Sequence, residues 1–254
     1  FTFIDLFAGI GGIRIAFERA GGRCVMTSEW DRFAQKTYQA QFQDGDEHLS
    51  VGDITEVPEA AHSPEALALT PLADDAVKVP GHDILVGGFP CQPFSIAGVS
   101  KKNALGRKHG FEDETQGTLF FNLKNLLLNT RPPAFLLENV KNLKSHDRGN
   151  TWRVIEKTLA DIGYVFSAKV IDARDTSPQH RERVFIVGFD RKAAGLETFH
   201  STEEHWAPFW EQVAGELAVE REREAAIYAS PPEDWPRVGA ILEETPDARY
   251  TLTE

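Results

Sequence analysis

Cysteine is scarce in this sequence. Its 254 residues contain only Cys24 and Cys91, in no metal-ligand spacing and no disulfide framework. No apolar run reaches the roughly 18 to 20 residues that a transmembrane helix needs, and the first residues resemble a strand rather than a basic leader. We therefore expect a cytoplasmic protein with no membrane partner and no metal, in which each cysteine serves packing or chemistry.

Basic residues are also few, because 27 Lys and Arg oppose 39 Asp and Glu, for a net charge of -12. This balance argues against extensive phosphate binding, which needs clustered cations. Most of the negative charge lies in residues 190–254, whose net charge is -9, whereas residues 1–189 have a net charge of only -3. A basic run formed by Lys101, Lys102, Arg107 and Lys108 lies in the less acidic part. This loop could therefore contact nucleic acid locally.

Alternating strand and helix signals predict an α/β fold. A strand at 2–7, a glycine-rich turn at 8–12 and a helix at 13–20 form the first unit, which Gly21 and Gly22 end. The pattern recurs with strands at 24–30, near 52–54, at 83–89 and at 134–140, and with helices at 32–41, at 119–128 and from a cap at Asn150 or Thr151 to Gly163. Strands separated by helices predict a mostly parallel, Rossmann-like sheet with helices on both faces.

The alternation of strands and helices ends after residue 163. Strands at 164–172 and 183–189 are separated only by a loop, which predicts an antiparallel hairpin at the sheet edge. Residues 190–254 form an acidic extension with a charged helix expected around 210–226.

The turn DLFAGIGG at 5–12 favours ligand binding at the start of the first helix. Glycines there let backbone N–H groups approach a ligand, although they serve helix–strand packing equally well. The dinucleotide fingerprint beginning at Gly9 would need a glycine where Arg14 stands, which disfavours a nicotinamide cofactor. Glu29 ends the second strand, where a carboxylate can accept both ribose hydroxyls.

The turn GGFPCQPFS at 87–95 is more specific. Cys91 lies at the carboxyl end of a predicted central strand, where open α/β sheets bind ligands. A buried inert cysteine is the alternative, but the surrounding prolines and glycines fix an irregular backbone that packing alone does not require. Glu138 ends the next strand and is either an acid or a tethering group. Arg181 and Arg183 open the final strand two residues apart, so we expect them on one face of it.

Six motifs in register carry a family resemblance. FIDLFAGIGG, SEWD (28–31), GDI (52–54), GGFPCQPFS, ENV (138–140) and QHRERVFIVG resemble the DNA cytosine-5 methyltransferases over residues 1–189. The resemblance implies a methyltransferase fold that binds S-adenosylmethionine, and methylation of C5 of cytosine in duplex DNA, in a restriction-modification or Dcm-like setting. Cys91 would be the nucleophile that attacks a flipped cytosine, Glu138 the acid, and Arg183, with Arg181, a helper at the base.

The resemblance also implies a cofactor site and a DNA-binding loop. The cofactor residues it indicates are Phe7, Ala8, Gly9, Gly11, Gly12, Glu29, Trp30, Asp53, Ile54 and Pro90. The loop after Cys91 resembles the longer catalytic loop of Dcm-type enzymes, and its expected DNA-binding residues are Gln92, Ser95, Lys101, Lys102, Arg107 and Lys108.

The family's target-recognition domain and its last motif are not visible in the sequence. We therefore expect a catalytic domain at 1–189, an acidic extension at 190–254 that leads toward recognition, and a second polypeptide or further C-terminal region that reads the DNA. The competing hypotheses are a tRNA cytosine methyltransferase, a non-catalytic subunit of a split methyltransferase and a nicotinamide oxidoreductase. The intact Cys91, Glu138 and Arg183 argue against the subunit.

Overall fold

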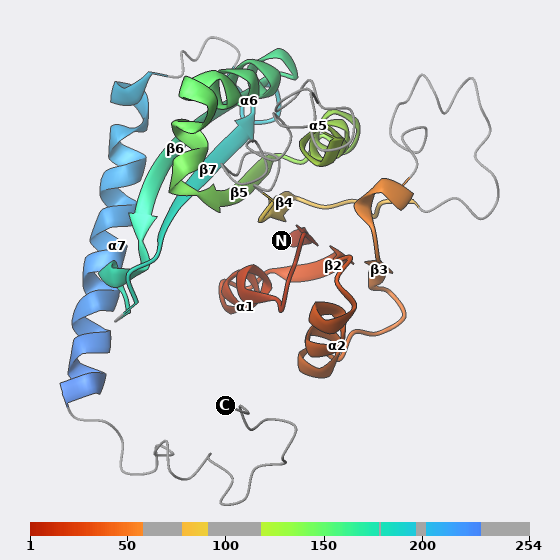
Figure 1. Cartoon of the computed structure of the whole chain (residues 1–254), viewed down its shortest axis with the longest axis horizontal. Coiled ribbons are helices and arrows are strands. Elements are labelled where there is room, and N and C mark those ends of the chain that lie inside the picture. The colour runs from red at the N-terminus through yellow and green to blue at the C-terminus, as the bar shows by residue number, and fades with distance from the viewer. Residues whose placement is uncertain (58–77, 91–117, 178, 197–201, 230–254) are drawn as a thin grey trace, which may run out of the picture.

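A seven-stranded sheet forms the centre of the chain (Figure 1). A computed structural model describes residues 1–57, 78–90, 118–177, 179–196 and 202–229. The strands are β1 (Thr2–Leu6), β2 (Arg23–Ser28), β3 (Leu49–Val51), β4 (Ile84–Gly87), β5 (Ala134–Val140), β6 (Tyr164–Asp172) and β7 (Glu182–Asp190). Their order is β3-β2-β1-β4-β5-β7-β6. The first five are parallel, whereas β7 is antiparallel to both β5 and β6. The predicted α/β sheet with an antiparallel hairpin at its edge is confirmed.

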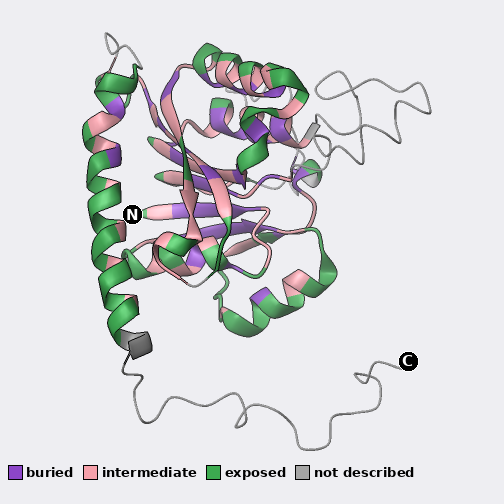
Figure 2. Ribbon diagram, turned by 60° about the vertical axis from the view of Figure 1, so that its left-hand side comes forward, coloured by how far each residue is buried: buried purple, intermediate pink, exposed green. Residues whose placement is uncertain are grey.

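The central parallel strands are buried on both faces. In β1, Phe3, Ile4 and Leu6 are fully buried, so consecutive rather than alternating positions are apolar. Parallel strands covered by helices on both sides have this continuous apolar character. The ribbon coloured by burial shows the same contrast between a buried sheet and more exposed helices (Figure 2).

Helices pack on both faces of the sheet. On one face, Phe17 of α1 (Gly12–Arg19) packs near Phe3. On the other, Leu123 and Ile155 join the main core from α5 (Thr118–Thr130) and α6 (Asn150–Asp161). A further helix, α2 (Arg32–Gln41), follows β2 and buries Tyr38.

The long helix α7 (Glu203–Ala229) lies along the hairpin (Figure 1). Trp206 stacks on Phe189 with ring centroids 5.9 Å apart, near the end of β7. Further along the helix, Arg221 forms a 2.9 Å ion pair with Asp175 in η7 (Ala173–Asp175), which follows β6. The helix therefore returns the chain from the end of β7 toward the turn that joins β6 to β7.

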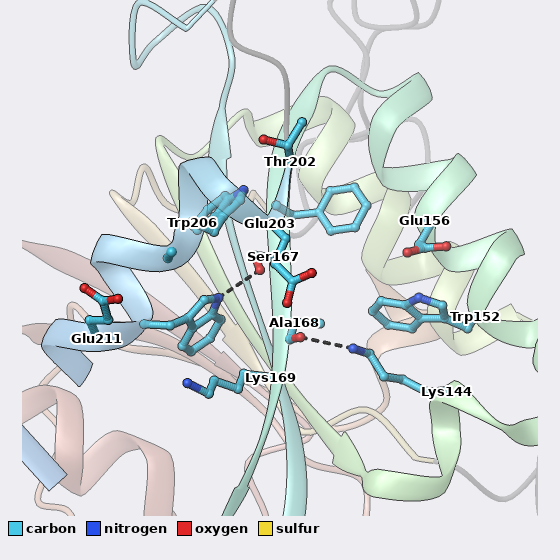
Figure 3. Close-up of a pocket in the computed structure, with 13 residues that line it drawn as sticks. Lys144, Trp152, Glu156, Ser167, Ala168, Lys169, Thr202, Glu203, Trp206 and Glu211 are labelled. Atoms are coloured by element: carbon cyan, nitrogen blue, oxygen red, sulfur yellow. Dashed lines mark hydrogen bonds between the residues drawn. The ribbon is translucent and has the colours of Figure 1, made fainter. Parts of the chain in front are cut away.

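A cavity of about 580 Å³ separates α6 from α7 above β6 (Figure 3). Trp152 of α6 lines the cavity (Figure 3). Trp210 of α7 also lines it and donates its indole N–H to the hydroxyl of Ser167 at 2.9 Å. The ammonium groups of Lys144 and Lys169 lie 5.0 and 5.7 Å from the ring centroids of Trp152 and Trp210. The two contacts of Trp210, with Ser167 and Lys169, attach α7 to β6.

Two local expectations were wrong, and a third covered only part of a helix. The strand expected near 52–54 ends at Val51, because the Asp53 carboxylate accepts the backbone N–H of Thr55 and caps the 3-10 helix η1 (Ile54–Glu56). Helix α6 begins after Gly149, whose φ of 83° is left-handed, so neither Asn150 nor Thr151 is its cap. Helix α7 is longer than the segment expected at 210–226.

Candidate active site

The glycine turn after β1 is held in an unusual backbone conformation. Phe7, Gly9 and Gly11 have φ values of 55°, 57° and 90°, a region that favours glycine. At Gly11 an added Cβ would lie 2.3 Å from the ring of Phe42, so close packing as well as backbone conformation requires glycine there. The first turn of α1 is therefore fixed against α2.

Glu29 ties this turn to the end of β2. One of its carboxylate oxygens accepts the backbone N–H of Gly9 at 2.7 Å, and the other accepts that of Asp31 at 2.8 Å. Because each carboxylate oxygen can accept more than one hydrogen bond, Glu29 retains capacity for ligand hydroxyls while its orientation is fixed.

A cavity of about 430 Å³ opens beside Glu29 at the carboxyl edge of the sheet. Its lining comes from the ends of β1, β2, β3 and β4 and from α5, and consists of Phe7, Ser28, Glu29, Trp30, Gly52, Asp53, Ile54, Thr55, Gly88, Pro90 and Leu119. The structure thus brings together six of the expected cofactor residues: Phe7, Glu29, Trp30, Asp53, Ile54 and Pro90. Ala8, Gly9, Gly11 and Gly12 shape the adjacent turn but do not line this cavity. The lining contains two carboxylates and no Lys or Arg among the described residues.

A buried polar network lies beneath the turn. Arg14, where the dinucleotide fingerprint has glycine, is buried and its guanidinium pairs with Asp44 at 2.8 Å and with the hydroxyl of Tyr38 at 3.2 Å. The Tyr38 hydroxyl is also 2.7 Å from that of Thr27 and donates to Asp5 at 3.4 Å. These bonds fix α1 to α2, a role that the sequence pattern did not indicate.

Asp5 is the most unusual member of this network. It is fully buried, and among the described residues one of its carboxylate oxygens has no hydrogen-bond partner. Burial raises its pKa to about 7, against the opposing effects of the Tyr38 hydroxyl and the charge of Arg14. A carboxyl group that keeps its proton below about pH 7 therefore lies under the turn that borders the cavity.

Glu138 and Arg183 meet at the same edge of the sheet. Nε of Arg183 lies 2.8 Å from a carboxylate oxygen of Glu138, and both side chains are about three-quarters buried. Burial raises the pKa of Glu138, although the positive charges of Arg183 and Arg181 act in the opposite direction. Gly88 leaves room beside this pair, because an added Cβ would lie 3.3 Å from the second Glu138 oxygen. The site is suited to holding a proton at Glu138.

Arg181 is placed differently from Arg183. Because β7 begins only at Glu182, Arg181 lies in the preceding loop, and strand alternation does not put the two arginines on one face. Arg181 is exposed, and its backbone N–H donates to Asp172 at 2.9 Å. Its charge nevertheless lies close enough to oppose the rise in the pKa of Glu138.

Asn139 is a site residue that the sequence analysis missed. Its buried amide donates to the carbonyl of Phe89 at 3.0 Å and accepts the backbone N–H of Val140 at 2.8 Å. The sequence signal for it was an amide at an inward-facing position of β5, next to Glu138. Through Phe89, it ties the strand that carries Glu138 to the turn that leads into Cys91.

The proposed nucleophile and the DNA-binding loop lie outside the described residues. These are Cys91, Gln92, Ser95, Lys101, Lys102, Arg107 and Lys108. The other cysteine, Cys24, is buried, and burial raises the pKa of its thiol to about 11. In the part of the chain that the structure describes, no three His, Cys, Asp or Glu side chains are grouped so as to bind a metal ion. No helix in that part has the length and apolar character needed to cross a membrane.

Comparisons with known proteins agree with the motifs. Residues 1–251 match the family described as C-5 cytosine-specific DNA methylase. The DNA-cytosine methyltransferase of Escherichia coli K12 is 50% identical over 204 residues, which cover 75% of this chain and 42% of that protein. Type II methyltransferase M.NlaX of Neisseria lactamica is 48% identical over 257 residues, covering 100% of this chain and 63% of its own length. The chain thus spans about half the length of the curated relatives it matches.

The fold is shared with solved methyltransferases. The structure of methyltransferase EhMeth of Entamoeba histolytica superposes with a TM-score of 0.52 at 18% identity, covering 74% of this chain and 52% of that one. At this identity the likeness concerns the fold.

Proposed function

This chain belongs to the C-5 cytosine-specific DNA methylase family, and from that membership we propose that it transfers a methyl group from S-adenosylmethionine to C5 of cytosine in duplex DNA. The observation that carries the proposal is the placement of the 430 Å³ cavity, the Glu138–Arg183 pair and the turn into Cys91 at one edge of the sheet. The names of the relatives support DNA rather than tRNA as the substrate.

The cavity fits the proposed cofactor chemically. Glu29 offers carboxylate oxygens to ribose hydroxyls, Trp30 and Ile54 offer apolar surface to a purine, and Asp53 keeps one carboxylate oxygen that does not cap η1. Carboxylates without cations suit a sulfonium ligand that has no phosphates, whereas a dinucleotide would bring a pyrophosphate into an acidic lining. When bound, S-adenosylmethionine supplies an electrophilic methyl group.

The chain's own residues would activate the base. The Cys91 thiolate adds to C6 of an extruded cytosine, while Glu138 shares a proton with N3 and Arg183 fixes the orientation of Glu138. These steps raise electron density at C5, which takes the methyl group. Loss of the C5 proton to a base and elimination of the thiolate then restore the ring and the free cysteine. A carboxyl group whose pKa is raised by burial favours the proton that Glu138 must hold.

The covalent step gives the direct test. Duplex DNA with 5-fluorocytosine at the target should trap a denaturation-resistant adduct, because fluorine cannot leave as the C5 proton does. Cys91→Ala should lack the adduct, and Cys24→Ala is the matched control that should retain it, since Cys24 is buried with a raised pKa. An adduct that persists in Cys91→Ala, or that maps to Cys24, would overturn the assignment.

Base recognition is assigned to a region beyond residues 1–189. We infer that residues 1–189 form the catalytic domain and that residues 190–254 lead toward a recognition region on the same or a second polypeptide. The matched part covers 42% and 49% of two of the relatives, and α7 returns the chain toward the turn between β6 and β7. Ile10, Trp30 and Phe33 are 60%, 78% and 62% exposed around the Glu29–Gly9 contact, a surface suited to further packing.

This inference is tested by purifying residues 1–254 alone and measuring methyl transfer to duplex DNA. The longer protein, or the chain supplemented with its candidate partner, should be active where residues 1–254 are not. Sequence-specific methylation by residues 1–254 at an undiminished rate would refute it.

A further inference from the structure

Strand β6 forms one edge of the sheet, and among the described strands it pairs only with β7. The register of this pair continues to Ala173, whose backbone N–H donates to the carbonyl of Arg181 at 3.0 Å. Bonded and non-bonded residue pairs alternate in an antiparallel ladder, so the odd-numbered residues of β6 bond to β7. The even-numbered residues Ala168 and Val170 therefore direct their backbone N–H and carbonyl groups away from the sheet.

A side chain already binds one of these outward groups. Nζ of Lys144, in η5 (Lys141–Lys144), donates to the Ala168 carbonyl at 3.1 Å (Figure 3). In the part of the chain that the structure describes, the N–H of Ala168 and both backbone groups of Val170 have no such partner. Val170 is 39% exposed, so this edge is open to solvent. An open edge of this kind is a template for a further strand.

Helices flank this edge on both faces of the sheet. Ala168 packs against the core that contains Ile155 of α6, whereas the next face carries Ser167, which binds Trp210 of α7. Successive side chains of a strand point to opposite faces, so α6 and α7 lie on opposite sides of β6. A strand added to this edge would therefore lie between two helices.

Two cavities join along the edge to form a groove. The 580 Å³ cavity between α6 and α7 is lined by residues 166–169 of β6, and a neighbouring cavity of about 280 Å³ is lined by residues 169–171. Lys169 and Trp210 line both cavities, so the groove follows β6 from residue 166 to residue 171. At about 3.3 Å per residue, this stretch has roughly the length of an ordinary strand. The groove is long enough for an extended peptide.

The charges along the groove favour a basic occupant. Its basic side chains are already engaged, because Lys144 and Lys169 hold their ammonium groups over tryptophan rings and Arg221 pairs with Asp175. Among the described residues, three carboxylates that line the groove form no ion pair or hydrogen bond, and they belong to Glu156, Glu203 and Glu211. These carboxylates attract cations, and they disfavour a second copy of this chain, which would bring the same three carboxylates to the contact.

We propose that this groove binds an extended, basic segment of a partner protein. The backbone of the segment pairs with Ala168 and Val170, and its lysine or arginine side chains meet the three carboxylates. The rings of Trp152 and Trp210 favour the same side chains, because ammonium and guanidinium groups bind over aromatic faces. None of the residues that line this groove lines the cavity beside Glu29, so an occupant does not displace the cofactor.

The test uses a fluorescent peptide of about eight alternating lysine and valine residues, whose binding to the chain is measured by anisotropy without DNA or cofactor. Ala168→Pro should weaken binding roughly five- to tenfold, because proline removes the outward N–H and leaves the bonds to β7 in place. Glu211→Gln should weaken binding roughly twofold and reduce its dependence on salt. Glu216→Gln is the matched control, because Glu216 is an exposed residue of α7 that lines neither cavity, and it should not change the affinity.

Hydrogen exchange locates the bound peptide. Residues 164–172 should gain protection when the peptide binds, whereas β3, at the opposite edge of the sheet, should not. Unchanged exchange in β6, full affinity in Ala168→Pro, or equal affinity for a glutamate–valine peptide would overturn the proposal. If Ala168→Pro unfolds, Val170→Pro removes the other outward N–H in the same comparison.

The exchange of β6 without peptide distinguishes the other occupants. Protection that grows with protein concentration would assign the edge to a second copy of the chain. Protection that is already complete in dilute solution would assign it to another segment of the chain itself. Either result would contradict the proposal.

Discussion

The carboxyl group of Asp5 should make the stability of the domain depend on pH. It is fully buried under the glycine turn, and burial raises its pKa from 3.8 to about 7. Between these two values the folded chain keeps a proton that the unfolded chain releases. Stability therefore falls as pH rises from about 4 to 7 and levels off above 7, once both states are ionised.

The magnitude follows from this difference in pKa. Between pH 5 and pH 8, the ionisation of Asp5 alone should lower the free energy of unfolding by about 2 to 3 kcal/mol. Asp5→Asn keeps the shape of the side chain and cannot ionise, so this pH dependence should disappear. If the amide beside Tyr38 lowers the free energy of unfolding by itself, it does so equally at both pH values.

Urea unfolding of the variant and the unaltered chain at pH 5 and pH 8 measures the effect. The stability of Asp5→Asn relative to the unaltered chain should rise by about 2 to 3 kcal/mol from the lower to the higher pH. Asp161→Asn, at an exposed carboxylate of α6, is the matched control and should shift stability equally at both pH values. A difference for Asp5→Asn that does not change with pH would show that Asp5 is ionised in the folded chain at pH 5, and would refute the reasoning.

Substitutions at four further positions test the site and the turn beside it. Glu29→Ala should weaken S-adenosylmethionine binding by about 1 to 3 kcal/mol in calorimetry, because a polar contact in the cavity is lost. Glu138→Gln should instead slow methyl transfer with little change in cofactor affinity, and the reverse pattern would exchange the roles of the two residues. Asn139→Ala and Asn139→Asp should both lower kcat about tenfold with a smaller effect on KM, because neither can donate to the Phe89 carbonyl, and normal turnover in Asn139→Asp would exclude that bond as the cause. Gly11→Ala should lower stability by roughly 1 to 3 kcal/mol in urea unfolding, because φ is 90° and a Cβ would meet an aromatic ring at 2.3 Å; unchanged stability would contradict this packing argument.

The sheet could be predicted because its signals are local. The central strands are mostly apolar, and Gly21 and Gly163, with φ values of 86° and 87°, end their helices as the sequence indicates. The edge hairpin was equally visible, because only a loop separates its two strands. Boundaries were less accurate where a side chain decided them, as at Asp53, whose capping bond ends the extended segment earlier than hydropathy suggests.

The sequence predicted the position of a site residue where that residue lies at the end of a strand. Parallel strands present their carboxyl ends at one edge, so Glu29 and Glu138 could be assigned to that edge from the sequence alone. Contacts that depend on packing could not be assigned. From the sequence, Arg14 indicated only that the dinucleotide fingerprint lacks a glycine. Its ion pair with Asp44, thirty residues away, shows that it joins α1 to α2.

The direction of β7 explains why basic residues at its start lie beside a site that is otherwise built from the carboxyl ends of strands. Because β7 is antiparallel to β5, its first residues lie opposite the last residues of β5, and Arg183 pairs in register with Val140. In an all-parallel sheet, a residue at the start of a strand would lie at the opposite edge from Glu138, a full strand length away. The antiparallel hairpin therefore adds cationic side chains to an edge where the parallel strands already supply Glu29 and Glu138. The loop before β7 is consequently where this fold can place further contacts to an anionic substrate.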